Sequence, residues 1–268
     1  IVAWDYQVWT PGHSSRPNGQ PGSLLAGQLL DPSAEPLRRR RGGGDRNAAH
    51  NYTCPNNWVR AHWVASTPLR CSSLRSLGGL ANTTANEAFL DELAALAETD
   101  PVAFRLRHLD DPRAIAVIEK AAEVSEWQSR SSPAPGAEPS AGEPLTGRGI
   151  AFARYETTYA YVAVVAEVAI DPTTGAVRVT RVTVAHDCGL IVNPDGVANQ
   201  IEGIVIQGIS RALKEEVTYD RTLVTSLDFS TYQIATFPEV PDLRVALIDR
   251  PEEPPLGAGE PAICPMVA

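Results

Sequence analysis

The chain has 268 residues, of which 43% are hydrophobic and 21% charged, and its formal net charge is −9. This length allows one large domain or two modest domains with a substantial buried core. The acidic balance argues against general binding to nucleic-acid backbones, which requires a basic face.

One basic run, four arginines at 38–41, is followed by three glycines, which favours a solvated loop over a binding patch. No apolar run approaches the roughly 20 residues that cross a bilayer. The chain begins on Ile1 within a strand-like pattern and ends on Ala268 within an apolar run. We therefore interpret it as a piece of a longer polypeptide.

The cysteines are widely spaced and form no C-x-x-C pair. This spacing argues against a metal or iron–sulfur site within the chain and favours free, mostly buried thiols. They are Cys54, Cys71, Cys188 and Cys264.

The first part of the chain is irregular apart from an alternating segment at 4–8, which predicts a short half-buried strand. The Pro-, Gly-, Ser- and Arg-rich stretch at 11–50 is unusually long for a loop in a compact domain. We expect disorder at 35–45, and we interpret His13 and His50 as solvated loop histidines rather than ligands.

Residues 58–64 alternate in polarity and predict a second strand. The next segment, 68–79, is rich in small and hydroxyl residues, ends on two glycines and carries Arg75. A guanidinium held in such a loop suits a planar anionic ligand, because its fork binds two oxygens at once. A structural arginine that pairs with a carboxylate is the alternative, and these residues leave both open.

Three helices are predicted next, with apolar stripes typical of a core. Asp100-Pro101 opens the second, to about residue 109, and Asp111-Pro112 opens the third, to about residue 127. A capping box at 84–87 opens the first, whose apolar face consists of Phe89, Leu90, Leu93, Leu96 and Ala97.

Residues 128–146 are rich in Ser, Pro, Ala, Gly and Glu and predict a linker or exposed loop. A β-hairpin follows, with strands at 159–170 and 176–186 joined by Asp-Pro-Thr-Thr-Gly. A helix is predicted at 197–213 and a last strand at 244–248.

The helix at 197–213 carries amides and glycines in its early turns, including Gln200, Gly203 and Gln207. Groups near a helix start offer donors to phosphate or pterin-like oxygens. Close helix–helix packing at the glycines explains them equally well.

Near the end of the chain, Glu260 lies between Gly257-Ala258-Gly259 and Pro261. Glycine permits positive φ and close approach of another group, and the proline favours extended backbone at Glu260. A carboxylate that points at a reacting centre needs such a setting. A Gly/Pro turn with an exposed glutamate is the simpler alternative.

Together, the segments at 73–79, 199–208 and 257–261 resemble the molybdenum-cofactor-binding large subunit of the xanthine dehydrogenase/aldehyde oxidase superfamily. The resemblance covers nearly the whole chain apart from roughly residues 16–45 and 128–146. Further short segments resemble the isoquinoline 1-oxidoreductase β-subunit branch of this superfamily. They lie at 46–48, 68–70, 104–109, 161–168 and 187–196.

This resemblance implies an α+β fold of the molybdopterin-binding type, with mixed sheets and packed helices. We expect a strand segment, a long irregular loop and a three-helix unit in 1–127, and a linker or exposed loop at 128–146. The part at 147–268 is expected to hold the β-hairpin, a cofactor-contacting helix and the Gly-Glu-Pro catalytic loop.

The resemblance also implies a molybdenum hydroxylase, in which R–H and water give R–OH, two electrons and two protons. By position, Glu260 matches the general base and Arg75 an arginine near substrate and cofactor. Gln200 matches an amide that binds the pterin cofactor, and Gln207 and Gly259 are further cofactor contacts. The dithiolene sulfurs of the cofactor hold the metal, so no protein ligand to molybdenum is expected.

The match is incomplete, because the family's glycine–glutamine cofactor loop is expected N-terminal to Ile1 and the helices after the Gly-Glu-Pro motif are missing. The expected cofactor is molybdopterin, with the cytosine dinucleotide form as a variant, and 2Fe–2S clusters are expected in a partner subunit only. Other expected partners are the remainder of the large subunit and a small-molecule substrate, with a c-type cytochrome or flavin subunit as a further candidate and no nucleic acid. We expect a bacterial protein that is periplasmic or membrane-associated facing the periplasm, with the cytoplasm as the alternative.

Two other functions compete with this interpretation. One is a non-catalytic scaffold or assembly module of such a complex, against which an intact upstream cofactor loop would argue. The other is a hydrolase with Glu260 as base, but the chain lacks a nucleophile motif or metal-ligand cluster for it. The substrate stays open between aldehydes and N-heteroaromatics such as isoquinoline or nicotinate.

Overall fold

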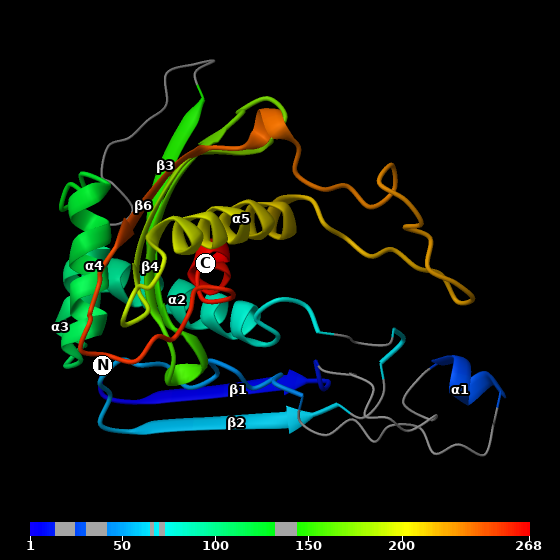
Figure 1. Ribbon diagram of the computed structural model, residues 1–268, viewed down its shortest axis with the longest axis horizontal. Helices are drawn as coiled ribbons and strands as arrows, with labels where there is room; N and C mark the ends of the chain where they lie inside the picture. The colour runs from blue at the N-terminus through cyan, green and yellow to red at the C-terminus, as the bar shows by residue number, and fades with distance from the viewer. Residues whose placement is uncertain (14–24, 31–41, 65–66, 70–72, 132–143) are drawn as a thin grey trace.

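The computed structural model describes residues 1–13, 25–30, 42–64, 67–69, 73–131 and 144–268. A four-stranded sheet in the order β3-β4-β5-β6 forms its centre (Figure 1). The first three strands pair antiparallel, and the fourth joins β5 in parallel. The strands are β3 (Leu145–Arg154), β4 (Tyr161–Ile170), β5 (Val177–Asp187) and β6 (Asp242–Leu247).

The predicted hairpin between β4 and β5 is confirmed, and its turn explains why the chain reverses there. The Asp171 carboxylate accepts hydrogen bonds from the backbone N–H groups of Thr173 (2.7 Å) and Thr174 (3.2 Å). Gly175 has a φ of +73°, a left-handed conformation that glycine adopts without strain from a Cβ.

Helices cover both faces of this sheet, which is why β4 is almost continuously apolar. Side chains alternate across a strand, so Ala163 and Val165 face one core and Val162 and Val164 face the other. The first core includes residues of α2, α3 and α4, and the second includes residues of α5 and α6 (Figure 1). These helices are α2 (Gly79–Leu96), α3 (Pro101–Arg107), α4 (Pro112–Val124), α5 (Pro194–Leu213) and α6 (Ile263–Val267).

A second, two-stranded parallel sheet consists of β1 (Trp4–Thr10) and β2 (Asn57–Trp63), which confirms both predicted strands. It lies beside α2 (Figure 1), where the Tyr6 hydroxyl donates to Oδ1 of Asn82 at 2.8 Å. The described elements also include α1 (Leu25–Leu30) and the short 3-10 helices η2 (Tyr155–Thr157) and η3 (Phe237–Glu239). Between α5 and η3, the chain extends away from the body (Figure 1).

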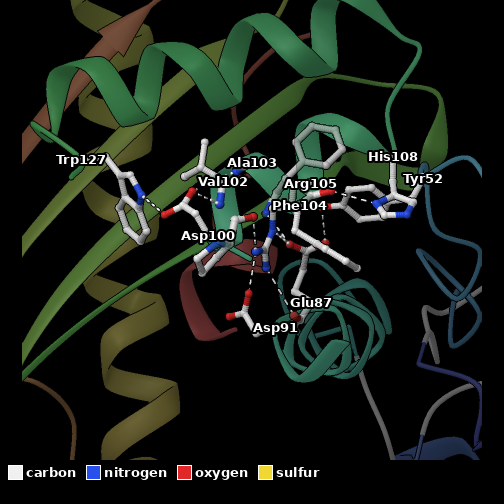
Figure 2. Close-up of polar contacts among 12 residues, drawn as sticks. Tyr52, Glu87, Asp91, Asp100, Val102, Ala103, Phe104, Arg105, His108 and Trp127 are labelled. Carbon is white, nitrogen blue, oxygen red and sulfur yellow. Dashed lines mark hydrogen bonds and ion pairs between the residues drawn. The ribbon is translucent and has the colours of Figure 1, made fainter. Parts of the chain in front are cut away.

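The predicted starts of α3 and α4 are confirmed, because an aspartate caps each of them. Figure 2 shows the Asp100 carboxylate beside the first turn of α3, where Oδ1 accepts from the N–H groups of Val102 and Ala103 at 3.0 Å each. Asp111 caps α4 in the same way through the N–H of Arg113 at 3.0 Å.

A buried ion-pair network joins α2 to α3 (Figure 2). Arg105 is fully buried and donates to Glu87 (3.0 Å) and Asp91 (2.6 Å). Glu87 also accepts from the Tyr52 hydroxyl and from the backbone N–H of Phe152, at 2.9 Å each. Buried charges are tolerated only when they are paired and hydrogen-bonded. The buried charges of Arg105 and Glu87 are paired with each other and hydrogen-bonded to further groups.

The predicted start of the first helix is wrong. α2 begins at Gly79, five residues before the supposed capping box, and the Thr84 hydroxyl donates instead to the carbonyl of Leu80 at 2.8 Å. The predicted apolar face is also wrong in part, since Leu90 is buried but Phe89 is 47% and Leu96 82% exposed. The inward face carries polar side chains because each has a partner: Asn82 and Asn86 donate to backbone carbonyls of the segment 44–48, and Glu87 accepts from Arg105.

Two further elements differ from prediction. α5 begins three residues early, because the Asn193 side chain caps it by accepting from the N–H of Gly196 at 3.0 Å. β3 was not predicted, and it takes Leu145 and Thr146 from the supposed linker, of which 132–143 lie outside the described residues.

The expected disorder at 35–45 lies mostly outside the described residues, as do the basic run and Cys71. Residues 42–45 belong to an ordered turn instead, in which the N–H of Arg46 donates to the carbonyl of Gly43 at 3.3 Å. His50 is not solvated, since its ring packs edge-on against Trp4 with centroids 4.5 Å apart. The division of the chain at the linker stays a prediction.

Candidate active site

Glu260 lies on the loop between β6 and α6, and this loop is held on both sides of the carboxylate. The N–H of Leu256 donates to the carbonyl of Cys188 at 2.8 Å, and Ala258 and Pro261 are buried. Between these anchors Gly257 has a φ of +76°, which other residues adopt only with strain. The predicted role of a glycine in shaping this loop is therefore confirmed at that position.

The Glu260 carboxylate contacts groups from three other segments. Its Oε2 accepts a hydrogen bond from the phenol of Tyr155 and lies 3.7 Å from Nη1 of Arg46. Its Oε1 accepts a long hydrogen bond, 3.4 Å, from the backbone N–H of Ser76. These contacts hold the carboxylate in place. Because 36% of its side chain is exposed, it is still reachable from solvent.

Sequence reasoning missed both Tyr155 and Arg46 as contacts of the carboxylate. Tyr155 follows the last residue of β3, a strand that was not predicted. Arg46 belongs to the segment 46–48, which supported the family resemblance but suggested no role for the arginine. The resemblance of this segment was the one indication in the sequence that Arg46 matters. Its contact with Glu260, 214 positions later (260 minus 46), is made only by the fold.

Unusual backbone conformations gather around this carboxylate. Of the seven non-glycine residues with positive φ among the described residues, five belong to segments that contact Glu260 or adjoin its contacts. Such conformations cost about 1–3 kcal/mol each and cluster at functional sites. The five are Asn47, Ser76, Leu77, Glu156 and Thr157.

The other predicted site residues gather beside this loop. Nη1 of Arg75 donates to Oε1 of Gln207 at 3.1 Å, which joins the segment at 73–79 to α5. Gln200 is exposed in the early turns of α5, and its amide nitrogen would lie 3.9 Å from a Cβ placed on Gly259. The structure therefore brings Arg75 together with Gln207, and Gln200 together with Gly259.

Arg75 and Glu260 form no ion pair among the described residues, and the cation beside the carboxylate is Arg46. The structural alternative for Arg75 predicted a carboxylate partner, but the observed partner is the neutral amide of Gln207. The guanidinium therefore keeps its charge uncompensated by that contact.

Glycines allow two close approaches that shape the site. A Cβ on Gly78 would lie 2.2 Å from the carbonyl oxygen of Gly44, so only glycine lets the turn at 42–47 reach the start of α2. A Cβ on Gly208 would lie 2.9 Å from the Met266 side chain, so close packing against α6 explains this glycine.

Burial controls the protonation of the groups around Glu260. Burial, together with the hydrogen bond to Glu260, holds the pKa of Tyr155 well above its ordinary value, so the phenol stays protonated. Burial also raises the pKa of the Cys264 thiol to about 12. Beside the backbone of Gly257, burial lowers the pKa of His186 to about 4, so its ring is neutral at pH 7.

The described residues contain no cluster of His, Cys, Asp or Glu that could hold a metal ion. What they present is a set of polar groups suited to a large organic cofactor: the exposed amide of Gln200, the uncovered backbone at Gly257 and the guanidinium of Arg75. Amides, backbone groups and guanidinium are the donors that pterin and phosphate oxygens accept. These residues therefore fit a molybdenum–pterin cofactor whose metal is held by the cofactor itself.

Comparison with known proteins identifies the family of this chain. Residues 66–241 match the family described as the molybdopterin cofactor-binding domain. The chain is 40% identical over its whole length to a subunit of nicotinate dehydrogenase from Pseudomonas putida. Over 75% of the chain it is 33% identical to the beta subunit of isoquinoline 1-oxidoreductase from Brevundimonas diminuta. The matches span 22% and 26% of these relatives' own lengths.

Solved structures share the fold. Quinoline 2-oxidoreductase from Pseudomonas putida 86 matches with a TM-score of 0.72 and 15% identity, over 84% of this chain and 53% of that chain. The aldehyde oxidoreductase from Desulfovibrio desulfuricans matches with a TM-score of 0.67 and 14% identity, over 86% and 43%. The family match over 66–241 and the relative that is 40% identical over the whole chain show the family: the chain belongs to the molybdopterin cofactor-binding domain family of the xanthine dehydrogenase/aldehyde oxidase superfamily. The expected α+β fold is confirmed.

Proposed function

We propose that the protein to which this chain belongs is a molybdenum hydroxylase that adds oxygen from water to a carbon of an N-heteroaromatic compound. The observation that carries the proposal is the Glu260 carboxylate, held by Tyr155, Arg46 and Ser76 but still reachable. The balanced reaction converts R–H and water into R–OH, two electrons and two protons.

Glu260 is the general base in this proposal. When bound, the molybdenum cofactor supplies the chemistry of oxygen transfer and takes up the two electrons. Glu260 accepts the proton that the water-derived oxygen must lose, and a base positioned for that transfer contributes about 10²–10⁴-fold. The contacts described above orient its carboxylate before substrate arrives, so no reorganisation is needed at the moment of transfer.

The remaining predicted residues take binding roles. Gln200 and the backbone at Gly259 border the same side of the loop, where their amide groups suit the cofactor. Arg75 offers a guanidinium fork to an anionic oxygen of substrate or cofactor, and Gln207 fixes its direction.

The names of the relatives favour an N-heteroaromatic substrate over an aldehyde. The nicotinate dehydrogenase and isoquinoline 1-oxidoreductase subunits are 40% and 33% identical to this chain. An aldehyde is the second candidate, since a membrane-bound aldehyde dehydrogenase of Gluconacetobacter polyoxogenes is 28% identical over 97% of the chain.

Partners and location extend the proposal. The relatives are named as subunits, which supports a complex, and we assign electron transfer to a small 2Fe–2S partner subunit. A c-type cytochrome or flavin subunit is a candidate for the next electron acceptor, and the cytosine dinucleotide form is a candidate for the cofactor. We place the complex in or facing the periplasm. None of the described helices is long and apolar enough to cross a membrane.

The test uses the full-length protein purified with its partner subunits. Nicotinate, isoquinoline and an aromatic aldehyde are each supplied with an electron-accepting dye in oxygen-18-labelled water. We expect a labelled hydroxylated heterocycle, and a product from the aldehyde alone would overturn the substrate assignment. Glu260→Gln should lower turnover by about 100-fold or more with molybdenum content unchanged. Glu252→Gln, an exposed glutamate eight residues earlier (260 minus 252), should have no effect.

A further inference from the structure

The hydrogen bonds around Glu260 have a defined direction. A guanidinium can only donate, and Nη1 of Arg46 lies 2.7 Å from the hydroxyl oxygen of Tyr155. That oxygen accepts from Arg46, so its single proton is donated to Oε2 of Glu260. Because burial and this hydrogen bond keep the pKa of Tyr155 well above its ordinary value, the donor persists throughout the neutral and alkaline range.

Arg46 and Tyr155 are held by contacts that do not involve Glu260. Arg46 forms an ion pair of 2.8 Å with Glu156. The side chain of Asn47 accepts from the N–H of Glu156 and donates to the carbonyl of Arg154, at 2.9 Å each. The turn at 42–47 and the turn after β3 are therefore tied to each other, and the Arg46–Tyr155 pair is a preformed receptor for one carboxylate oxygen.

The two carboxylate oxygens are consequently unequal. Oε2 already accepts the hydrogen bond from the phenol and lies beside the Arg46 cation. Oε1 receives, among the described residues, only the long 3.4 Å hydrogen bond from Ser76. Ser76 and the adjacent Leu77 have φ of +73° and +51°, so this donor is placed by an unusual backbone conformation.

The other charged and titratable groups near the carboxylate leave this asymmetry in place. The Glu156 charge is offset by Arg46, and the Cys264 thiol stays neutral because burial raises its pKa to about 12. Arg75 directs its guanidinium to Gln207.

We propose that Tyr155 and Arg46 are positioning residues that fix Oε2 of Glu260 and leave Oε1 as the oxygen that accepts the proton. This inference rests on the assignment of Glu260 as the general base. A carboxylate without these contacts would rotate and would present either oxygen, so the proton would less often meet a correctly placed acceptor.

The experiment compares the full-length enzyme, with its partner subunits, as wild type, Tyr155→Phe, Glu260→Gln and the double variant. Tyr159→Phe is the matched control, because Tyr159 is 46% exposed and its ring centre lies 6.4 Å from that of Tyr155. Molybdenum content, kcat and KM are measured for each.

We expect Tyr155→Phe to keep its molybdenum and to lower kcat by about 10- to 100-fold with little change in KM, the range for losing a hydrogen bond to a charged group. In the Glu260→Gln background the same change should have less than about a twofold effect, since residues acting through one group are not additive.

A molybdenum-replete Tyr155→Phe with the wild-type kcat would overturn the inference, as would an equal loss in both backgrounds. If Glu260→Gln itself keeps full turnover, the proposed function fails instead. Where Tyr155→Phe yields no soluble enzyme, Arg46→Gln decides by the same comparison in the two backgrounds, with a smaller loss of kcat expected and no loss contradicting the role.

Discussion

Arg75 and Gln207 lie 132 positions apart in the chain, and the guanidinium of the first donates to the amide oxygen of the second at 3.1 Å. The backbone of Arg75 is held as well, since Nη1 of Arg211 donates to its carbonyl at 2.9 Å. Both contacts come from one face of α5, so this helix sets the position of the segment that precedes α2. The N–H of Ser76, the next residue, then reaches Glu260.

Replacing Arg75 by lysine should weaken catalysis although the charge is kept. An ammonium cannot both bond Gln207 and present a planar fork to a second partner. We expect kcat/KM of the full-length enzyme to fall by about tenfold, the scale of one charge-assisted hydrogen bond. Arg178→Lys, at an exposed position on β5, is the control. Full activity in Arg75→Lys would show that Arg75 acts only as a point charge.

Gly78→Ala should destabilise the protein and disturb the site. The new Cβ would lie 2.2 Å from the Gly44 carbonyl oxygen, so the turn carrying Arg46 must move away from α2. Overpacking of this kind costs about 1–3 kcal/mol. The thermal unfolding midpoint of the full-length protein reports the effect. Gly149→Ala, whose Cβ would meet no atom within 4 Å, should be neutral, and equal midpoints for both variants would contradict the packing argument.

Arg105→Met should be among the most damaging substitutions away from the site. It would leave the Glu87 carboxylate buried without its cation, and burial already raises the pKa of that carboxyl. Removing one partner of a buried pair costs about 3–5 kcal/mol. Lys120→Met, which removes an exposed pair with Glu123, should cost under about 1 kcal/mol.

The double variant Arg105→Met with Glu87→Gln serves as the cross-check for this pair. It should recover part of the lost thermal stability, because no net charge then remains buried at position 87. A double variant no more stable than Arg105→Met would mean that the loss comes from packing rather than from the unpaired charge.

His186 should make the protein less stable in mild acid. Its folded-state pKa is about 4 because of burial, against 6.5 when unfolded, so below pH 6.5 the unfolded state binds the extra proton. The free energy of unfolding is unaffected by this group above pH 6.5. It decreases as the pH falls from 6.5 to about 4, by a total of about 3 kcal/mol. Thermal midpoints at pH 7 and 5 measure it.

The variant that tests this group is His186→Gln. It should flatten the dependence of the thermal midpoint on pH between 7 and 5, because the buried imidazole is gone. An unchanged slope in His186→Gln would assign the acid sensitivity to other groups.

Local sequence signals predicted the elements whose stabilising contacts are themselves local. The caps at Asp100 and Asp111 and the hairpin turn at Asp171 involve partners within three residues. A short stretch of sequence is therefore enough to predict each of them. α2 shows the opposite case. Part of its inward face is polar because Glu87 accepts hydrogen bonds from Arg105 and from the N–H of Phe152. Both partners lie outside α2, so the sequence of the helix does not reveal them.

The family, the hairpin and the aspartate caps of α3 and α4 could be predicted from the amino-acid sequence, because each depends on residue type at short spacing. The surroundings of the Glu260 carboxylate could not, and they emerge from the folded chain. Tyr155 and Arg46 come from segments 105 and 214 positions before it (260 minus 155 and 260 minus 46). Contacts over such separations depend on how the sheet, α2 and α5 pack together, and the periodicity of one segment does not show which distant segment it will contact.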